Sequence, residues 1–524
     1  MATDPALEAL TDEQVLAAAT PLPAVFLEAA PGSGKTTVAA QRFGALRYRP
    51  RYLPDGTPDH RAVLAVSFTR SATHELRQRV RQTWGPAALS WPHRICTLDT
   101  LVYDLLEDLL ACGLVRWPGG ATHLDVHDSW KVLVRHGFTK LEYGAEVSTS
   151  GDVRVAIVER HERKKANPEP IPMQVEIEQG RCTHSDVRRI LLGSLVSRAE
   201  IQERVIATLS KTVGALIVDE VYDANGLDLG LIRAIVRSKA PVTLIGDPWQ
   251  ALYGWRGATP EKVPTLIVDL GLSTLPLSKS HRWRSAEQGE LAAALRSSDP
   301  VTLPQRPDTD DLDVVLSHKW EDLWSAADTI LPLAFGSTPS TTFEAALTLL
   351  LQRAVQAAFS VDATFLSDAL TTLGLTDQAA LVRLEPALDS LLTTLKAATT
   401  PAERRAIRAG LIDVVRSESE RDFPGIHWSH TARLKLLATR LQGPGRLVPA
   451  MTVHQAKGRE WDRVGIRLRE EERAALSQGL NKDVEDHRRL YVACTRARYG
   501  TVEVTAAGST TENRHAPHPS PPPR

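Results

Sequence analysis

Short apolar runs bounded by turn residues recur along the first half of the chain. Four of them cover residues 25–27, 62–68, 215–218 and 241–245. A stretch with helical spacing follows each run, and such alternation is typical of a parallel sheet with helices on both faces. A second set of runs predicts further strands late in the sequence, at 447–453, 464–468 and 501–504.

Two segments between these runs have a different pattern. Leu, Ala and Thr recur at helical spacing over residues 341–416, as in EAALTLLLQRAVQAAF, which predicts an all-helical insertion. The stretch from about 106 to 185 is less periodic, and we expect a second inserted subdomain there. From Gly508 on, the sequence has no apolar face and predicts a disordered tail.

A phosphate-binding loop follows the first apolar run, because residues 29–37 read AAPGSGKTT. Gly32 and Gly34 allow successive backbone N–H groups to point at phosphate oxygens, and the helix that begins here adds its positive end. In the pattern GxxxxGK[ST], Ala29 replaces the first glycine. The loop predicts ATP binding with Mg2+, by Ala30, Pro31, Gly32, Ser33, Gly34, Lys35, Thr36 and Thr37.

A pair of acidic residues, Asp219 and Glu220, ends the apolar run at 215–218. A carboxylate at the end of a strand beside a phosphate loop suits Mg2+, and its neighbour can orient or deprotonate the attacking water. We therefore assign Thr36 and Asp219 to magnesium and Glu220 to the general base. An Asp-Glu pair alone is weak evidence, and its value comes from following a later strand of the same predicted sheet.

The composition is that of an ordinary globular chain, with 43% hydrophobic and 24% charged residues among 524. The four cysteines form no CxxC pair, which favours a reducing, cytoplasmic location and argues against structural zinc. Residues 1–20 do not read as a signal peptide, and the sequence holds no apolar run long enough to span a membrane.

The net charge of −1 means that any contact with nucleic acid must come from local basic patches. One candidate patch comprises Arg70, Arg77, Arg79 and Arg81, and a second comprises Arg160, Arg163, Lys164 and Lys165. For each of them, a solvated helix face is an equally good interpretation.

The segment GDPWQALYGWRGA at 246–258 resembles the third motif of the UvrD/Rep-like superfamily 1 DNA helicases. Other segments resemble the remaining motifs in the order of that family. They are LTDEQ at 10–14, LAVSFTR at 64–70, SHR at 280–282, TVHQAKGRE at 452–460 and RRLYVACTRA at 488–497. The insertions between these segments carry no recognisable motif.

The resemblance implies roles around ATP. Gln14 would contact the adenine edge, His281 would stand where an aromatic ring stacks on adenine, and Glu460 would contact the ribose. Arg282 and Arg496 would act as arginine fingers from a second RecA-like domain, reaching the phosphates only when the cleft closes. Gln250 would sense the γ-phosphate and pass its state to the DNA groove. The expected catalytic set is Lys35, Glu220, Gln250, Arg282 and Arg496.

The resemblance also implies a track for single-stranded or partly duplex DNA. Aromatic rings stack on bases of any sequence, as a motor that steps along a strand requires. The expected DNA-binding residues are Phe68, Arg70, Thr97, Tyr253, Trp255, Arg256 and His454.

Several alternatives stand beside these roles. Arg284 competes with Arg282 as the arginine of the fourth motif, and we favour Arg282 on its spacing from Leu277. Tyr253 and Trp255 would be core aromatics if they were isolated residues. His93 and His454 would suit a metal, but they lack an HxxxH or cysteine partner, which favours satisfied polar histidines.

The sequence departs from the family pattern at Tyr222, which stands where the family has glutamine and puts the coupling between hydrolysis and DNA in doubt. We also expect the nuclease domain of RecB- and AddA-like relatives to be absent. We predict two RecA-like parallel-sheet P-loop domains, each interrupted by a mostly helical inserted subdomain. The first domain would comprise 1–105 and 186–275, with 106–185 inserted. The second would comprise 276–325 and 441–507, with 326–440 inserted, and 508–524 would form the tail.

The expected function is that of a DNA-stimulated ATPase that translocates 3′ to 5′ on a single strand and unwinds duplex, with ATP held between the two domains. The alternative is a regulatory ATPase subunit that gates a partner nuclease. The length, short insertion and missing nuclease domain resemble the helicase-like subunit of Gabija-type anti-phage systems.

Overall fold

The computed structural model describes residues 10–53, 55–127, 130, 141–160, 171–375, 378–423, 428–443 and 445–505. The chain divides into two compact units. Unit 1 comprises residues 1–298 and 480–495, and unit 2 comprises residues 299–479 and 496–524. The expected tail from Gly508 lies outside the described residues, as do Arg163, Lys164, Lys165 and the side chain of Arg160.

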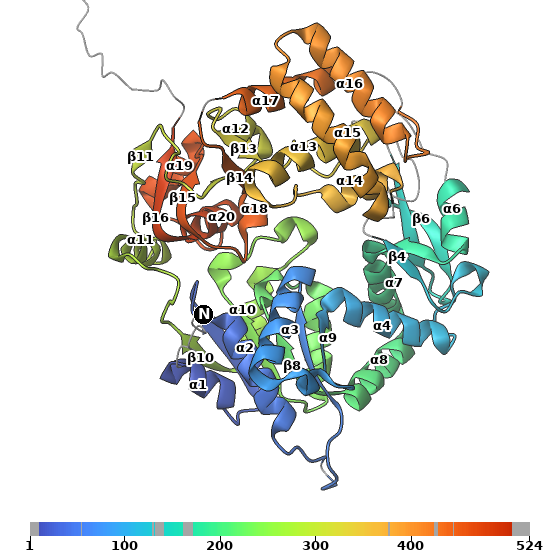
Figure 1. Cartoon of the computed structure of the whole chain (residues 1–524). Coiled ribbons are helices and arrows are strands. Elements are labelled where there is room, and N and C mark those ends of the chain that lie inside the picture. The colour runs from blue at the N-terminus through green and yellow to red at the C-terminus, as the bar shows by residue number, and fades with distance from the viewer. Residues whose placement is uncertain are drawn as a thin grey trace, which may run out of the picture. The chain divides into compact units, whose positions relative to one another are not determined.

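Unit 1 is built on a six-stranded parallel sheet of order β10-β1-β9-β8-β2-β3 (Figure 1). Its strands are β1 (Ala24–Ala29), β2 (Ala62–Ser67), β3 (Arg94–Thr97), β8 (Val213–Val218), β9 (Val242–Gly246) and β10 (Ser273–Leu277). Its principal helices are α1 (Asp12–Ala19), α2 (Lys35–Tyr48), α3 (Arg70–Trp84), α4 (Leu98–Ala111), α7 (His184–Ser197), α8 (Ala199–Thr212), α9 (Gly226–Arg237), α10 (Val263–Asp269), α11 (Ala286–Arg296) and α20 (Glu485–Cys494).

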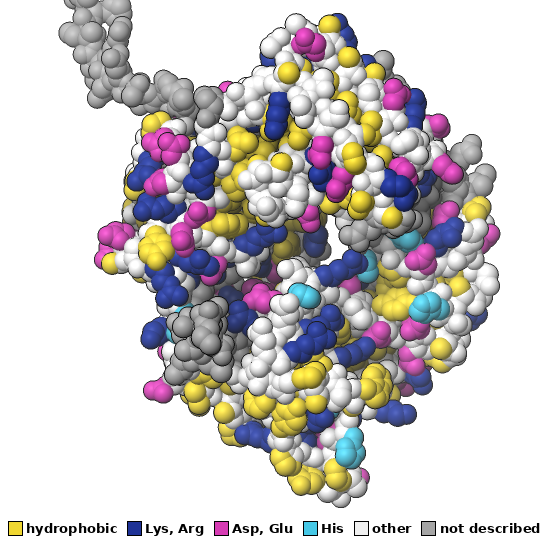
Figure 2. Space-filling model, viewed as in Figure 1, with side chains coloured by type: hydrophobic (Ala, Val, Ile, Leu, Met, Phe, Trp, Pro, Cys, Tyr) yellow, Lys and Arg dark blue, Asp and Glu magenta, His cyan; other side chains and the backbone are white. Residues whose placement is uncertain are grey.

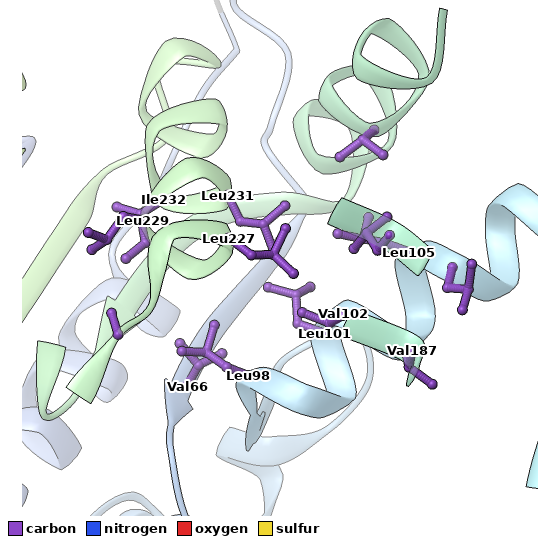
Figure 3. Packing of buried hydrophobic residues seen from close by; sticks show 14 of the residues in the cluster. Val66, Leu98, Leu101, Val102, Leu105, Val187, Leu227, Leu229, Leu231 and Ile232 are labelled. Carbon is purple, nitrogen blue, oxygen red and sulfur yellow. The ribbon is translucent and has the colours of Figure 1, made fainter. Parts of the chain in front are cut away.

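Helices cover both faces of this sheet because successive strand residues point to opposite sides. Val25 and Leu27 of β1 pack into a cluster with α2 and α3. Phe26 of the same strand joins a second cluster, which contains α4, α7, α8 and α9. Figure 3 shows part of this second cluster, including Leu101 of α4 and Leu227 of α9.

The segment inserted before α7 is not mostly helical in its described residues, which corrects that part of the prediction. Its strand β4 (Asp125–His127) pairs with β7 (Arg181–Thr183), and β5 (Leu141–Val147) pairs with β6 (Val153–Arg160). Helix α6 (Ile171–Glu178) lies between β6 and β7 in the sequence. Val153 and Val155 alternate with Arg154 in β6, and this period of two favours a half-buried strand.

Unit 2 has its own six-stranded parallel sheet, of order β11-β16-β15-β12-β14-β13. Its strands are β11 (Gln305–Arg306), β12 (Val314–Ser317), β13 (Ile330–Pro332), β14 (Val448–Thr452), β15 (Trp461–Ile466) and β16 (Ala497–Val504). Its helices are α12 (Trp320–Trp324), α13 (Thr342–Phe359), α14 (Leu366–Leu373), α15 (Gln378–Ala397), α16 (Pro401–Arg416), α17 (Trp428–Gln442), α18 (Val453–Ala456) and α19 (Glu470–Gln478).

The predicted fold class, α/β with two parallel sheets, is therefore confirmed. All seven predicted apolar runs overlap strands of these two sheets. The described chain between β13 and β14 is helical, as the spacing over residues 341–416 indicates. The apolar runs missed β3, β10, β11, β12 and β13 of these sheets. The residues of β10 are mostly exposed at the edge of the sheet, which explains why it shows no apolar run.

One buried cation fixes the first helix against the sheet. Arg42 of α2 is 1% exposed, and its guanidinium donates to the carbonyl oxygens of Thr20 and Leu22 and to the hydroxyl of Thr243. These bonds hold the connection between α1 and β1, and hence Gln14, beside the loop that follows β1. Burial, together with Arg49, lowers the pKa of Arg42 to about 10, so it stays charged at neutral pH. None of the described helices is long and apolar enough to cross a bilayer.

Candidate nucleotide and strand-binding site

The loop after β1 adopts the conformation that phosphate binding requires. Gly32 and Gly34 have φ of 72° and 81°, a left-handed conformation that suits glycine. A Cβ atom on Gly32 would lie 2.5 Å from Cβ of Arg282, so space as well as conformation excludes a side chain. Gly34 caps the N-terminus of α2 without a side-chain hydrogen bond. The buried Ser33 hydroxyl finds no partner among the described residues, which leaves a polar atom inside the loop for a ligand.

Two segments that flank this loop bring together predicted ATP-binding residues. Gln14 of α1 donates from Nε2 to the Ser33 carbonyl oxygen at 2.9 Å. The backbone N–H of His281 donates to the Gly32 carbonyl oxygen at 2.8 Å, and its Nε2 lies 3.5 Å from Nε2 of Gln14. Glu13 accepts from Ser278 at 2.6 Å and 2.8 Å, which lowers the pKa of the Glu13 carboxyl group. Gln14 and His281, which are predicted to contact adenine, therefore both lie beside the loop.

Lys35, the proposed phosphate-binding cation, and Glu220, the proposed general base, face one another at the same edge of the sheet. Lys35 Nζ lies 4.0 Å from a carboxylate oxygen of Glu220, and both side chains are largely buried. Asp219 is 4% exposed, and its Oδ1 accepts the Glu220 N–H at 3.0 Å. Glu220 has φ of 58°, a left-handed conformation that is strained for a residue with a side chain. Such strain clusters at functional sites, where surrounding contacts impose it.

Arg282, rather than Arg284, lies against the loop. The Arg282 backbone follows His281 across Gly32, and its Nη1 donates to the Thr495 carbonyl oxygen at 2.8 Å. Arg284 is exposed. Arg282 belongs to unit 1 and already borders the loop, whereas the sequence prediction had it reaching the loop only after the cleft closes.

Gln250 is held in place by a buried network that the sequence did not reveal. Its Nε2 donates at 2.8 Å to Asp247, whose side chain is fully buried. Asp247 also accepts from Arg296 at 3.1 Å, and Arg296 donates to the hydroxyl of Tyr491 at 3.3 Å. Burial is the largest single influence and lowers the pKa of Arg296, but the charge of Asp247 and the contacts with Tyr491 together raise it more, so the net shift is upward. The third motif is thereby linked to α20 within unit 1.

Packing and a second hydrogen bond reinforce this link. The rings of Trp249 and Tyr491 lie 4.9 Å apart, and Arg488 Nε donates to the Ala251 carbonyl oxygen at 2.7 Å. Asp247 and Tyr491 each stood in a quoted motif without an assigned role, and Arg296 was missed altogether. Arg296 gives no sequence signal, because it is a single arginine at the end of an alanine-rich helix.

Tyr222, which departs from the family pattern, is a core residue here. It is 6% exposed, its ring meets Phe26 edge-on at 6.3 Å, and it packs over Gly246. Burial raises the pKa of Tyr222, with further contributions from Glu28 and Asp247. The side chain therefore supports the strand next to Asp247 from the apolar side, while Arg296 supplies the polar contact to that carboxylate.

Several of the predicted DNA-binding residues follow the carboxyl ends of strands in unit 1. Phe68 follows β2, Arg70 begins α3, and Thr97 ends β3, where it pairs in register with Ser67. Tyr253 and Trp255 follow β9, and Trp255 is 64% exposed, which excludes the core-aromatic alternative for this residue. The Arg256 guanidinium lies 4.7 Å from the Trp255 ring centroid and 5.4 Å from that of Tyr253. Tyr253, Trp255 and Arg256 thus form a cationic aromatic group.

The first basic patch is partly engaged inside the fold. Arg77 donates to the Ile95 carbonyl oxygen, and Arg79 donates to Glu75 and to the Thr37 hydroxyl at 2.8 Å. Only Arg70 and Arg81 of that patch are exposed. The patch as a whole is therefore closer to a structural helix face than to a phosphate track.

Three predicted residues belong to unit 2. Arg496 is 1% exposed, and its Nη1 lies 3.5 Å from the Arg459 carbonyl oxygen that it donates to. Glu460 accepts from Arg498 at 3.0 Å, and His454 lies in the short helix α18. Their roles at ATP and DNA stay predictions.

The histidines do not form a metal site in the described residues. His93 Nδ1 accepts the Val63 N–H at 3.0 Å, as the satisfied-polar interpretation requires. Burial, with the charges of Arg47 and Arg51, lowers the pKa of His93 to about 4. In the described part of the chain, His, Cys, Asp and Glu side chains form no cluster of three or more that could hold a metal.

Comparison with protein families gives two matches in the order of the motifs. Residues 12–256 match the model of an AAA domain, and residues 387–500 match that of a UvrD-like helicase C-terminal domain. The first match contains the phosphate loop, Asp219 and Gln250. The second contains Glu460, Tyr491 and Arg496.

Individual relatives agree with these matches. The chain is 25% identical to DNA helicase II of Haemophilus influenzae over 296 residues, which cover 53% of this chain and 39% of that protein. It is 25% identical over 266 residues to the ATP-dependent DNA helicase Rep of Escherichia coli, covering 48% and 38% of the two chains. It is 33% identical over 284 residues to Rep of Buchnera aphidicola, covering 51% and 41%. The aligned part thus spans about two fifths of these relatives' length, and the chain is similar to the UvrD/Rep-like helicases in both matched segments.

Proposed function

We propose that this protein is a DNA-dependent ATPase that moves 3′ to 5′ along single-stranded DNA and separates duplex ahead of it. One observation carries the proposal: the left-handed glycines of the phosphate loop lie within hydrogen-bonding reach of both the α1 segment and the segment 278–282. The direction of movement is taken from the family. The relatives named DNA helicase II and Rep support the choice of DNA as substrate.

The side chains around the loop have separate roles in ATP hydrolysis. Lys35 neutralises charge on the β- and γ-phosphates, and the loop N–H groups bind their oxygens. Glu220 holds the attacking water and accepts its proton. Arg282 meets charge that develops on the γ-phosphate, and releases the Thr495 carbonyl oxygen to do so. The ion pair of Lys35 with Glu220 keeps both groups oriented before ATP arrives.

The oxygen donors beside the loop fit a magnesium ion. Thr36 begins the first turn of α2, and the Asp219 carboxylate is held in one orientation by the Glu220 N–H. A hydroxyl and a carboxylate are hard oxygen ligands of the kind that Mg2+ prefers, with phosphates and water in its other positions. Bound there, the ion would supply positive charge at the β- and γ-phosphates.

Single-stranded DNA is proposed to lie along the carboxyl ends of β2, β3 and β9. Trp255 and Tyr253 stack on bases, and Arg256 adds a cation beside both rings. Trp255 is five residues after Gln250, which is fixed through Asp247 and Arg296 to α20. We therefore propose that a DNA strand bound at Trp255 influences the γ-phosphate through Gln250.

A regulatory ATPase subunit that acts on a partner nuclease, in a cytoplasmic complex, is the second candidate. Burial of Tyr222 in place of the family's polar glutamine favours it, because one polar link between hydrolysis and DNA is missing. The two candidates differ in whether the protein alone is stimulated by DNA.

The first prediction tests the proposed function directly. ATP turnover by the purified full chain should rise on addition of single-stranded DNA and should vanish in Glu220→Gln, because the amide cannot accept a proton. This variant should still bind ATP, whereas Lys35→Ala should lose affinity. Steady-state hydrolysis and equilibrium nucleotide binding measure the two effects. Turnover without DNA stimulation would favour the regulatory subunit, and wild-type turnover in Glu220→Gln would remove the base assignment.

The second prediction separates the two arginines of the fourth motif. Arg282→Ala should lower kcat by about a thousandfold with little change in KM, because an arginine finger acts mainly in the transition state. The kcat of Arg284→Ala should stay within about twofold of the wild-type kcat. Parallel kcat and KM measurements on both variants decide the matter. A pure KM effect at Arg282 would assign it to ground-state binding instead.

The third prediction concerns the strand. Trp255→Ala should raise the DNA concentration for half-maximal stimulation by a factor that corresponds to about 1–3 kcal/mol, because one stacked base is lost. Trp255→Phe keeps a ring and should recover most of that affinity. ATPase rates against oligonucleotide concentration at two salt concentrations provide the measurement. An unchanged half-saturation point in Trp255→Ala would move the strand to another surface.

The fourth prediction addresses the buried network. Arg296→Met leaves Asp247 charged and buried without its cation, and we expect the free energy of unfolding to fall by about 3 kcal/mol. Adding Asp247→Asn removes the buried charge and should restore much of that stability, but not DNA stimulation, because the polar connection from Gln250 through Arg296 to Tyr491 is broken. Urea unfolding and stimulated ATPase rates give the two readouts. Full stimulation in the stable double variant would show that this network does not couple the sites.

A further inference from the structure

A basic cavity of about 410 Å3 lies at the end of unit 1 away from the phosphate loop. Its walls come from the end of α2 with the following chain, from residues 58–60 before β2, and from residues 91–93 before β3. Both strands begin there, so the cavity lies at the amino edge of the parallel sheet. Helix α2 spans its 14 residues between the phosphate loop and this cavity, a length of about 20 Å.

The cavity concentrates exposed aromatic side chains. Among the Tyr and Trp residues that the structure describes, five are exposed: Tyr48, Tyr52, Trp91, Trp255 and Tyr499. Three of the five line this cavity, and Trp91 and Tyr52 are 87% and 66% exposed. In Figure 2, yellow hydrophobic side chains gather with basic and histidine side chains at the lower end of the view, where Figure 1 shows the chain after α2. Folding gains little from leaving such rings in water, so their clustering points to a ligand.

The walls also carry more positive than negative charge. Arg47, Arg49 and Arg51 contribute to the walls, and Asp59 is the single acidic residue among the lining residues that the structure describes. Both Asp59 oxygens accept from Arg61, which is not part of the lining, at 2.9 Å each. Asp59 also forms an ion pair with Arg51 at 3.6 Å, which leaves Arg47 and Arg49 without a lining carboxylate. The cavity therefore has an excess of cation over anion.

Arg47 is the cation least engaged by the protein. Its Nε is buried without a hydrogen-bond partner, and its guanidinium lies 5.3 Å from the Tyr48 ring centroid. By contrast, Arg49 donates to the Ala19 carbonyl oxygen. Arg51 donates from Nη2 to the Arg61 carbonyl oxygen and pairs with Asp59, although its Nη1 is also buried without a hydrogen-bond partner. An unsatisfied buried guanidinium N–H is costly, and a bound anion would satisfy it.

We propose that this cavity binds one nucleotide unit, with its base stacked on Trp91 and Tyr52 and its phosphate on Arg47. Aromatic rings beside arginines recognise a base and a phosphate together, and 410 Å3 lies within the usual range of small-ligand pockets, about 300–1,000 Å3. The nucleotide is either free in solution or part of a strand. The site is separate from the ATP loop and does not depend on the proposed motor activity.

The test is calorimetric titration of the full chain with thymidine 5′-monophosphate and, separately, with a short oligothymidylate. Trp91→Ala and Arg47→Gln should each raise the dissociation constant about tenfold or more. Tyr499 in unit 2 is as exposed as Tyr48 in unit 1, and Tyr499→Ala serves as the control. This variant should leave the dissociation constant unchanged. Lys35→Ala should also leave it unchanged, which separates this site from the phosphate loop. Melting temperatures check that each variant folds.

A second measurement needs no variant. Photo-crosslinking of 5-bromodeoxyuridine 5′-monophosphate, followed by peptide mapping, should label residues 47–60 or 91–93 of the wild type.

The outcomes distinguish the sources of the nucleotide. If the Trp91 and Arg47 variants weaken tight binding of the monophosphate, the natural ligand is a free nucleotide. If they weaken binding of the oligonucleotide alone, the natural ligand is a nucleic-acid strand. The proposal is overturned if neither ligand depends on these residues, or if inorganic phosphate binds equally well and Trp91→Ala has no effect. Binding of an acidic aromatic peptide through the same residues, without nucleotide binding, would identify a peptide-docking pocket instead.

Discussion

Parallel hydrogen bonding in the sheet of unit 1 is the constraint on which the whole candidate site depends. Because all six strands run in the same direction, the residues that follow β1, β8 and β9 emerge at one edge. The phosphate loop, Asp219 with Glu220, and Asp247 with Gln250 are therefore brought together although more than 200 residues separate the first from the last. A strand of opposite direction at any of these positions would carry its polar residues to the far edge.

The most demanding element at this edge is the fully buried carboxylate of Asp247. A buried charge is tolerated only when it is paired and hydrogen-bonded, and Asp247 satisfies this through Trp249, Gln250 and Arg296. The same pairing positions Gln250 and connects it to Tyr491 on α20. Burial of Tyr222 next to Gly246 fits this arrangement, since the strand beside Asp247 is packed with apolar surface on its other side.

Helix α2 gives unit 1 two opposite ends with different chemistry. Its N-terminus presents N–H groups and Lys35 at the carboxyl edge of the sheet, where anions bind favourably. The helix ends at Tyr48, and the arginines next to Tyr48 line the basic cavity. A cation near a helix C-terminus is stabilised by the carbonyl groups there, which offsets part of the cost of placing several arginines together.

The sequence by itself determined the two parallel sheets, the helical segment over 341–416 and the phosphate loop, because hydrophobic periodicity and glycine positions act locally. It also identified Gln14, Lys35, Glu220, Gln250 and Arg282 as candidates, since each stands in a short motif. Only the tertiary structure decided that Arg296 pairs with Asp247, that Arg77 and Arg79 are engaged within the fold, and that Tyr48, Tyr52 and Trp91 meet in one cavity. These contacts join residues that lie 18 to 49 positions apart, and no local pattern encodes which of many arginines or aromatic residues will be neighbours once the chain has packed.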